Sequence, residues 1–270
     1  MNIQQLPLTV SGMARDFQSL GVGAGMSLIV HASLKSTNRW IVGGPSAVVL
    51  ALEHALGPQG TLVMPTHTSD LSEPSDWQNP PVPESWWPII REEMPPFEAH
   101  LTPSRHMGSM AECFRKQEGT LRSSHPQVSF AARGQHARRI TENHALTDSL
   151  GEQSPLARLY ELDGWVMLLG VGYNRNTSLH LSEHRGEYAI KQHRQQGAPC
   201  LVNGQREWTV YQDLDYDSGD FDIIGEAFEQ EYGEAVRVGK VGDADVRLMP
   251  IRSLVEFGVN WIEKHRNIKS

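Results

Sequence analysis

Residues 26–65 read MSLIVHASLKSTNRWIVGGPSAVVLALEHALGPQGTLVMP, and this stretch gives the first indication of the fold. Residues 26–31 form an apolar, β-branched run typical of a buried strand. A Gly-Gly-Pro-Ser start then introduces residues 47–56, which predict a helix, and residues 61–64 predict a second buried strand. Strand, helix and strand within about 40 residues predict a βαβ unit, and therefore a parallel sheet covered by helices.

The rest of the chain extends this α/β pattern. Residues 165–171 predict a third buried strand, and residues 174–193 after it contain a predicted helix. Residues 205–260 alternate polar and apolar positions, which is typical of an antiparallel or mixed portion of sheet. Its expected elements are strands at 207–211 and 245–250 and a closing helix at 255–265. Because no internal repeat or linker occurs, we expect one domain over residues 1–270.

The charge and the cysteine content indicate which kind of ligand and which cellular compartment to expect. The chain has 24 Lys plus Arg against 32 Asp plus Glu, a formal charge of −8, which disfavours nucleic acid and favours a small cationic ligand. Cys113 and Cys200 are too few for a disulfide framework or a four-cysteine zinc site, so a reducing compartment is expected. No signal peptide or long apolar run is present in this sequence, and the expected location is the cytoplasm.

One long segment lacks periodicity. Residues 67–105 are rich in proline and contain Trp77, Trp86 and Trp87. A loop of this length in a compact protein is often a functional lid or a binding wall. The alternative is an irregular surface excursion whose tryptophans fill the core, and the sequence leaves both open.

The densest group of reactive side chains lies in the sequence NTSLHLSEH, which begins at Asn176. Asn176 or Thr177 can cap a helix here, and His180, Glu183 and His184 then share one face. His-x-x-Glu-His is also the motif of inverted zinc proteases, in which both histidines bind metal. The structural alternative is one buried histidine bonded to a local carboxylate, with the other histidine on the surface.

Three further segments carry candidate binding residues. Residues 31–36, with the helix start at Gly43 and Gly44, could cradle phosphates, although no dinucleotide fingerprint, P-loop or Gly-x-Ser-x-Gly elbow is present. Residues 122–129 could clamp a ligand or form a structural turn. The aspartates of the run at residues 213–222 alternate, which is typical of a solvated face, but one of them could orient a histidine.

The order of these segments identifies a family. The matching blocks are Val30–Leu34, Gly43-Gly44, Gly60–Thr66, Met107-Gly108, Arg122–Ser129, Ser154–Leu156, Leu168–Gly172 and Asn176–Glu183. Taken together in this order, they resemble the aminoglycoside 3-N-acetyltransferase family, antibiotic acetyltransferases unrelated to the common GNAT fold. One departure is Ala32-Ser33, where the family commonly has Ser-Ser. Another is the insertion at residues 70–96, which we expect to set the antibiotics that fit.

The resemblance implies a fold and a reaction. The expected fold is a single α/β domain with a mixed central sheet flanked by helices, present as a monomer or homodimer. The expected donor is acetyl coenzyme A, with no metal, and the acetyl group passes directly, in a ternary complex, to the 3-amino group of a 2-deoxystreptamine aminoglycoside. Open alternatives are another amine acceptor, a zinc hydrolase using His180 and His184, and a protein that binds the coenzyme or a cationic drug without turnover.

The resemblance also assigns residues. It implies His180 as the catalytic base, Glu183 as an acidic wall of the acceptor site, and Asp213, or Asp215 if the alignment slips, as the acidic partner of the histidine. The chemistry agrees, because an amine attacks a thioester only as its free base and a neutral imidazole can take the proton. The oxyanion could be held by backbone amides of residues 33–36 or by the Thr177 hydroxyl.

The remaining candidates are binding residues. A cationic acceptor favours carboxylates and aromatic walls, which Asp70, Glu73 and Trp77 offer together with Glu183 and Asp213. The residues that the resemblance gives to the coenzyme are His31, Ala32, Ser33, Leu34, Lys35, Ser36, Val42, Gly43, Gly44, Arg122, His125 and Ser129.

Overall fold

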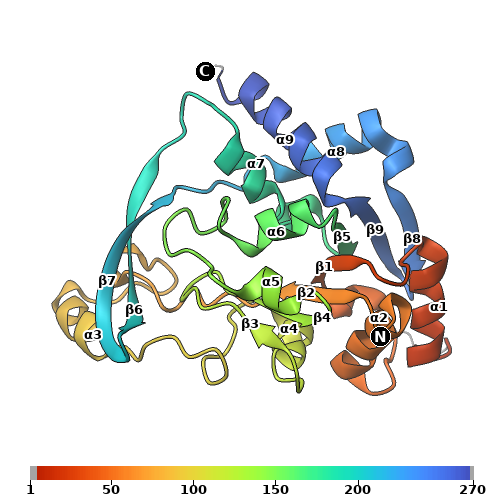
Figure 1. Ribbon diagram of the computed structural model, residues 1–270, viewed down its shortest axis with the longest axis horizontal. Helices are drawn as coiled ribbons and strands as arrows, with labels where there is room; N and C mark the ends of the chain where they lie inside the picture. The colour runs from red at the N-terminus through yellow and green to blue at the C-terminus, as the bar shows by residue number, and fades with distance from the viewer. Residues whose placement is uncertain (1–4, 268–270) are drawn as a thin grey trace.

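A seven-stranded mixed sheet forms the centre of the molecule (Figure 1), in a computed structural model that describes residues 5–267. Strand β1 is parallel to both of its neighbours, β2 and β5, whereas β4 and β9 pair antiparallel to the strands beside them. The predicted βαβ unit and the mixed sheet are therefore confirmed. The strand order is β3 (Leu121–Arg122), β4 (Phe130–Gly134), β2 (Thr61–Pro65), β1 (Ser27–Ala32), β5 (Trp165–Leu169), β9 (Ala244–Pro250) and β8 (Arg237–Val241).

Helices cover both faces of this sheet, because successive side chains of each central strand point to opposite faces. In β1, Leu28 and Val30 pack on one face and Ile29 on the other, and all three are buried. The helices on the first face are α1 (Val10–Leu20), α2 (Gly44–Leu56) and α4 (Gly108–Phe114). Those on the second are α5 (Ala137–Thr141), α6 (Pro155–Glu161), α7 (Leu179–Arg185), α8 (Phe221–Tyr232) and α9 (Ile251–His265).

Helix α2 has the local signals that the sequence indicates. Gly43 precedes it with φ +88°, a left-handed conformation that glycine adopts without a steric penalty, and Pro45 lies in its first turn. Gly57 ends it with φ +66°. Leu52 and its neighbours on the inner face are fully buried, so packing against the sheet stabilises the helix.

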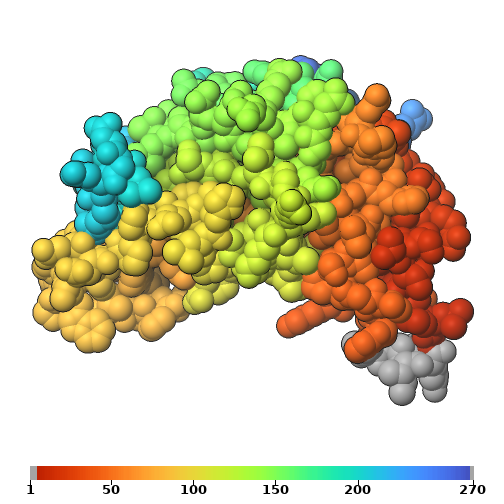
Figure 2. Space-filling model, turned by 60° about the horizontal axis from the view of Figure 1, so that its bottom comes forward, coloured from red at the N-terminus to blue at the C-terminus, as the bar shows by residue number. Residues whose placement is uncertain are grey.

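A two-stranded sheet lies apart from the central one. Strands β6 (His193–Val202) and β7 (Gln205–Leu214) pair only with each other among the described strands. The strand expected at 207–211 is thus confirmed as part of β7, but it belongs to this separate hairpin. The segment at 67–105, which contains η2 (Pro74–Asp76), η3 (Glu84–Trp86) and α3 (Trp87–Glu93), lies with the hairpin at the end of the molecule opposite α1 and α2 (Figure 2).

The segment at residues 67–105 does not fill the core. Trp86 is 55% exposed, and Trp77 and Trp87 are half-buried, so the expectation of core tryptophans is wrong. Instead the segment docks on the hairpin through its backbone. Phe97 N donates to Pro199 O at 3.3 Å, and the Arg206 side chain donates to Met94 O at 3.1 Å.

Several elements differ from their expected bounds. The closing helix α9 begins at Ile251, four residues before the predicted 255, and β5 ends at Leu169. Strand β9 fits the prediction at 245–250. None of the helices that the structure describes combines the length and apolar character that a membrane crossing needs.

Candidate active site

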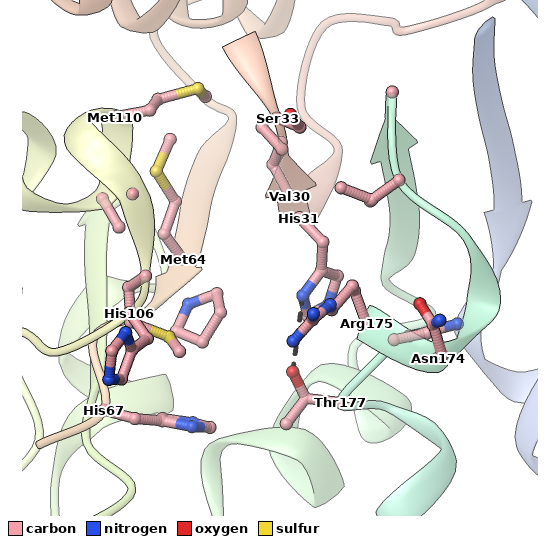
Figure 3. Close-up of a pocket in the computed structure, with 18 of the residues that line it drawn as sticks. Val30, His31, Ser33, Met64, His67, His106, Met110, Asn174, Arg175 and Thr177 are labelled. Carbon is pink, nitrogen blue, oxygen red and sulfur yellow. Dashed lines mark hydrogen bonds between the residues drawn. The ribbon is translucent and has the colours of Figure 1, made fainter. Parts of the chain in front are cut away.

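A pocket of about 950 Å³ opens at the carboxyl ends of three parallel strands. The end of β1 and the turn after it contribute Val30–Lys35, and the start of the loop after β2 contributes His67 (Figure 3). The loop after β5 contributes Gly170–Gly172 and Asn174–Thr177. From β1 the chain continues through α2 to β2, whereas from β5 it continues on the other face toward β9. Ligands bind at such a switch point in open α/β sheets, which makes this pocket the candidate active site.

His180 faces this pocket from the first turn of α7. Its side chain is 16% exposed, and its Nδ1 lies 2.5 Å from Oε2 of Glu183, three residues later on the same face of the helix. Glu183 is fully buried. A carboxylate on Nδ1 favours the tautomer in which Nε2 has the free lone pair, so this nitrogen can accept a proton in the pocket.

The surroundings hold the pair in place. Ser182 Oγ donates to Val255 O at 3.0 Å, and α9 passes close to α7 because Gly258 leaves room for Ser182. The predicted capping by Asn176 or Thr177 is wrong. The residue before the helix is Ser178, and Asn176 Oδ1 accepts from Ser178 N at 3.1 Å, so Asn176 closes the turn that leads into α7.

The predicted acidic partners of His180 are corrected by the structure. Asp213 accepts hydrogen bonds from Ser149 N at 2.9 Å and Ser149 Oγ at 2.6 Å. Burial raises the pKa of Asp213, although these hydrogen bonds act in the opposite direction. Asp215 forms an ion pair with Arg194 at 3.4 Å. Glu183 is the carboxylate on His180, while Asp213 ties the loop at Ser149 to β7.

Only part of the predicted coenzyme set lies at the pocket. Five of its members line the pocket at the end of β1 and in the turn that follows: His31, Ala32, Ser33, Leu34 and Lys35. Ser36 instead donates to Gly170 O at 2.8 Å and fixes the two loops to each other. Val42, Gly43 and Gly44 lie at the start of α2 and are not among the described residues that line the pocket.

The segment at residues 122–129, for which the sequence left a ligand clamp and a structural turn open, forms a structural turn. Arg122 donates to Thr66 O at 2.7 Å and to Ser129 Oγ at 3.0 Å, and Ser129 is fully buried. His125 is buried as well and accepts from the backbone amides of residues 127 and 128 at 3.1 and 3.0 Å. These side chains are used to hold the loop against β2, and none of the three lines the described pocket.

The predicted acceptor residues are also outside the pocket lining. Asp70 pairs with Arg105 at 3.3 Å on the surface, and Trp77 Nε1 donates to Ser72 Oγ at 2.9 Å. Glu73 binds the Arg91 guanidinium, which lowers the pKa of Glu73 against the effect of partial burial. No Asp or Glu is among the described residues that line the pocket, and Glu183 lies behind His180.

The zinc-site motif does not form a ligand cluster. His184 packs its ring against Gly151, and Glu183 is bound by His180 and Arg266. Over residues 5–267, no group of three or more His, Cys, Asp or Glu side chains could hold a metal ion.

Sequence reasoning missed three titratable side chains among the described residues that line the pocket: His67, His106 and Arg175 (Figure 3). The two histidines stand near the ends of the proline-rich segment, where it leaves and rejoins the pocket. His106 follows no strand, so its position in the sequence gave no signal. His67 follows β2 by two residues, and parallel strands place the residues after their carboxyl ends on one edge. Arg175 follows β5 in the same way.

The buried histidines of the site remain neutral. Burial first, and then the proximity of His180, lower the pKa of His31 and of His67 to about 3. The Nδ1 of His31 lies 3.4 Å from Thr177 Oγ1, and the Nε2 atoms of both histidines are buried without a hydrogen-bond partner in the described structure. The pocket therefore contains neutral imidazoles beside His180.

This burial predicts a loss of stability in acid. Unfolded histidines take up protons near pH 6.5, whereas His31 and His67 do so only near pH 3, so the unfolded state binds more protons between these values. Below pH 6.5, each of the two histidines should lower the free energy of unfolding by about 1.4 kcal/mol for each pH unit. Urea denaturation at pH 7.5 and 5.0 measures the free energy of unfolding. Between these pH values, His67→Asn should lose less of this free energy than the wild type. Equal losses in both proteins would contradict the prediction.

Comparisons with known proteins show the family of this chain. The family model for aminoglycoside 3-N-acetyltransferase matches residues 29–263. The SPbeta prophage-derived aminoglycoside N(3')-acetyltransferase-like protein YokD of Bacillus subtilis (strain 168) is 42% identical over 266 residues, 97% of this chain and 96% of that protein. Aminoglycoside N(3)-acetyltransferase III of Pseudomonas aeruginosa is 34% identical, with 96% and 94% covered.

Solved structures match over nearly the whole chain. The crystal structure of YokD superposes with a TM-score of 0.95 at 40% identity, covering 98% of this chain and 97% of that one. AAC-IIIb, in a binary complex with CoASH, gives a TM-score of 0.85 at 29% identity, covering 98% and 100%. AAC-VIa, bound to sisomicin, also gives 0.85, at 27% identity, covering 97% and 100%.

The family model and these relatives define an acyltransferase. The chain belongs to the aminoglycoside 3-N-acetyltransferase family, which confirms the resemblance seen in the order of its motifs.

Proposed function

We propose that this enzyme transfers the acetyl group of acetyl coenzyme A to the 3-amino group of a 2-deoxystreptamine aminoglycoside, with His180 as the general base in a ternary complex. The observation that carries the proposal is the His180–Glu183 hydrogen bond, which orients a free imidazole nitrogen toward the pocket. It is supported by the similarity of the chain to AAC-IIIb, which was solved in complex with CoASH.

The reaction follows from the position of His180. Its Nε2 removes a proton from the acceptor amine as the amine nitrogen attacks the thioester carbonyl. The C–N bond forms, the tetrahedral intermediate collapses, and the C–S bond breaks. The imidazolium then returns its proton to the departing thiolate. Glu183 stabilises the imidazolium in between, and the Thr177 hydroxyl or backbone amides of residues 33–36 are the candidate donors to the oxyanion.

The charge at the pocket suits the coenzyme. Lys35 and Arg175 line it, and neither forms an ion pair with another residue in the part of the chain that the structure describes. Coenzyme A carries phosphates, which such cations bind by charge-assisted hydrogen bonds. We assign Lys35 and Arg175 to the phosphate end of the coenzyme, and the neutral histidines to the thioester end.

Arg175→Ala should therefore raise the KM for acetyl coenzyme A by about 10-fold, since a hydrogen bond to a charged group contributes about 1.5–3 kcal/mol. We expect kcat to change little, because the phosphates are distant from the reacting carbonyl. Initial rates at varied coenzyme concentration measure both constants. Arg139→Ala is the matched control, because Arg139 forms an exposed pair with Glu161. Equal KM values for the two variants would remove Arg175 from the coenzyme site.

The acceptor is tested by thiol release from acetyl coenzyme A with a panel of aminoglycosides, followed by NMR of the product to locate the acetylated nitrogen. We expect release with 2-deoxystreptamine compounds and acetylation at position 3. Acetylation elsewhere would overturn the regiochemistry.

A second candidate acceptor is a less charged amine. It is favoured by one observation: the carboxylates predicted to bind a polycation, Asp70 and Glu73, are paired with Arg105 and Arg91, and Asp213 with Ser149. The same assay with simple monoamines separates the two acceptors. Release with monoamines and none with aminoglycosides would select this candidate and reject the first.

A further inference from the structure

Glu183 has a second partner on the side away from His180. Its Oε1 accepts from Arg266 Nη1 at 2.6 Å and from the backbone amide of Asp217 at 2.9 Å. The carboxylate is thus bonded on both oxygens, with His180 on Oε2. Arg266 lies just after α9, far from His180 in the sequence.

The Arg266 guanidinium is itself fixed on several sides. Its side chain is only 7% exposed, and it donates to both carboxylate oxygens of Asp220, at 2.6 and 2.9 Å. It also donates to Asp217 O at 2.8 Å and lies over the Tyr188 ring. Burial lowers the pKa of Arg266, but the hydrogen bonds to Asp220 and Glu183 outweigh this and raise it above its usual value. The planar guanidinium therefore joins two carboxylates in one geometry.

We propose that Arg266 is a positioning residue for the catalytic base, acting through Glu183 to fix the orientation of His180 and to limit how tightly that imidazole holds a proton. The inference rests on the proposed function for the identity of the base. It adds a chain of four side chains in contact, Asp220–Arg266–Glu183–His180, which the family assignment does not provide.

The electrostatic argument concerns the charge that His180 experiences. A buried carboxylate without a counter-charge favours the imidazolium, and a base that holds its proton is unavailable at neutral pH. Arg266 offsets the charge of Glu183, whereas Asp220 competes for Arg266 and weakens that offset. Other titratable or charged groups near the pair are Tyr188, Tyr216 and Asp217. On the pocket side, His180 shares the lining with the neutral His31 and His67 and with Lys35, His106 and Arg175.

Removal of the two outer charges should therefore act in opposite directions. Arg266→Met leaves Glu183 and Asp220 without their shared cation, so His180 should protonate at higher pH. Asp220→Asn removes the competing carboxylate and leaves Arg266 to Glu183, so His180 should protonate at lower pH. Asparagine is nearly isosteric with aspartate and remains a favourable residue before helix α8, so it suits this comparison.

The test measures kcat and kcat/KM from pH 5 to 9 for the full chain and for Arg266→Met, Arg266→Lys and Asp220→Asn. For Arg266→Met we expect the acid limb to move up by about one pH unit and kcat to fall about 10- to 100-fold, with the KM for acetyl coenzyme A nearly unchanged. Arg266→Lys should restore the acid limb but only part of kcat, because a lysine cannot bind both carboxylates in the same geometry. Asp220→Asn should move the limb down.

The control is Arg252→Met in helix α9. Arg252 donates to Asp163 at 2.7 Å and to Tyr160 O, so its loss removes an arginine–carboxylate pair of similar length, although a more exposed one, away from His180. We expect a change in melting temperature alone, with the pH profile of wild type. A shift of the limb in Arg252→Met would show that the effect is not specific to Glu183.

A second readout does not depend on turnover. NMR of histidine-labelled protein follows the titration of the His180 ring directly in each variant, assigned by the signal lost in His180→Gln. Opposite shifts for Arg266→Met and Asp220→Asn support the proposal even if no acceptor releases thiol, in which case only the proposed function fails. Shifts of the same sign, or none, would show that Arg266 is merely a structural tie, whatever its effect on rate.

Discussion

Replacement of His180 by glutamine is expected to lower kcat by about 10²- to 10⁴-fold, the usual contribution of a positioned general base. Glutamine keeps a polar side chain of similar size but cannot take a proton from the acceptor amine. The affinity for acetyl coenzyme A should stay within about twofold, since the cations proposed to bind its phosphates, Lys35 and Arg175, are untouched. Thiol release gives kcat, and calorimetric titration of coenzyme A gives the affinity.

His184→Gln is the matched control, because His184 follows one helical turn later in α7 and does not line the described pocket. It should keep kcat near the wild-type value. If both variants lost activity equally, or if His180→Gln kept more than a tenth of it, His180 would not be the base. Loss of activity in both variants, together with inhibition by chelators, would support the alternative of a zinc hydrolase.

Glu183→Gln should have the largest combined effect on activity and stability. The glutamine can still accept from Arg266, but it carries no charge, so the buried guanidinium keeps only Asp220 as an ionic partner. Removal of one partner of a buried ion pair costs about 3–5 kcal/mol, and Asp220 should hold the loss near the lower end. We expect kcat to fall by about 10²-fold or more, because the imidazolium loses its stabilising carboxylate.

Urea denaturation and steady-state rates measure the two effects of Glu183→Gln separately. Glu187→Gln is the control, since Glu187 is 86% exposed and its pair with Lys191 spans 3.5 Å, so its loss should change neither quantity measurably. A stable but inactive Glu183→Gln protein would reduce Glu183 to a catalytic role only. A destabilised protein with full kcat would exclude it from the mechanism.

The part of the site that the sequence predicted is local in the chain. His180 and Glu183 are separated by three residues, and helical periodicity alone places them on one face. Asp213 shows the limit of that reasoning. Its alternation with Asp215 predicts a common face but not a partner, and its actual partner, Ser149, is 64 residues away in the sequence. A local sequence pattern cannot show which of several carboxylates, carried by different helices and strands, contacts His180.

The role of Arg122 stayed open in the sequence for the same reason. A polar loop with one cation is compatible with a ligand clamp or with a structural turn, and only the tertiary fold shows that Thr66, 56 residues away, takes its hydrogen bonds. The central strands were easier to predict from the sequence, because β1, β2 and β5 are buried on both faces and form continuous apolar runs. Strand β6 was missed, since its sequence HRQQGAPCLV contains glycine and proline and is exposed over its first residues.

The pairing of β5 with β9 has a consequence for synthesis on the ribosome. Leu169 pairs with Val246, so an emerging chain has the parallel strands long before β9 is made. Until then β5 presents an open, apolar edge that could pair with other nascent chains, a known hazard of sheets completed late. Arg266 emerges later still. We expect nascent chains to need chaperone protection over this interval, and acetyl transfer to begin only after the final helix has docked.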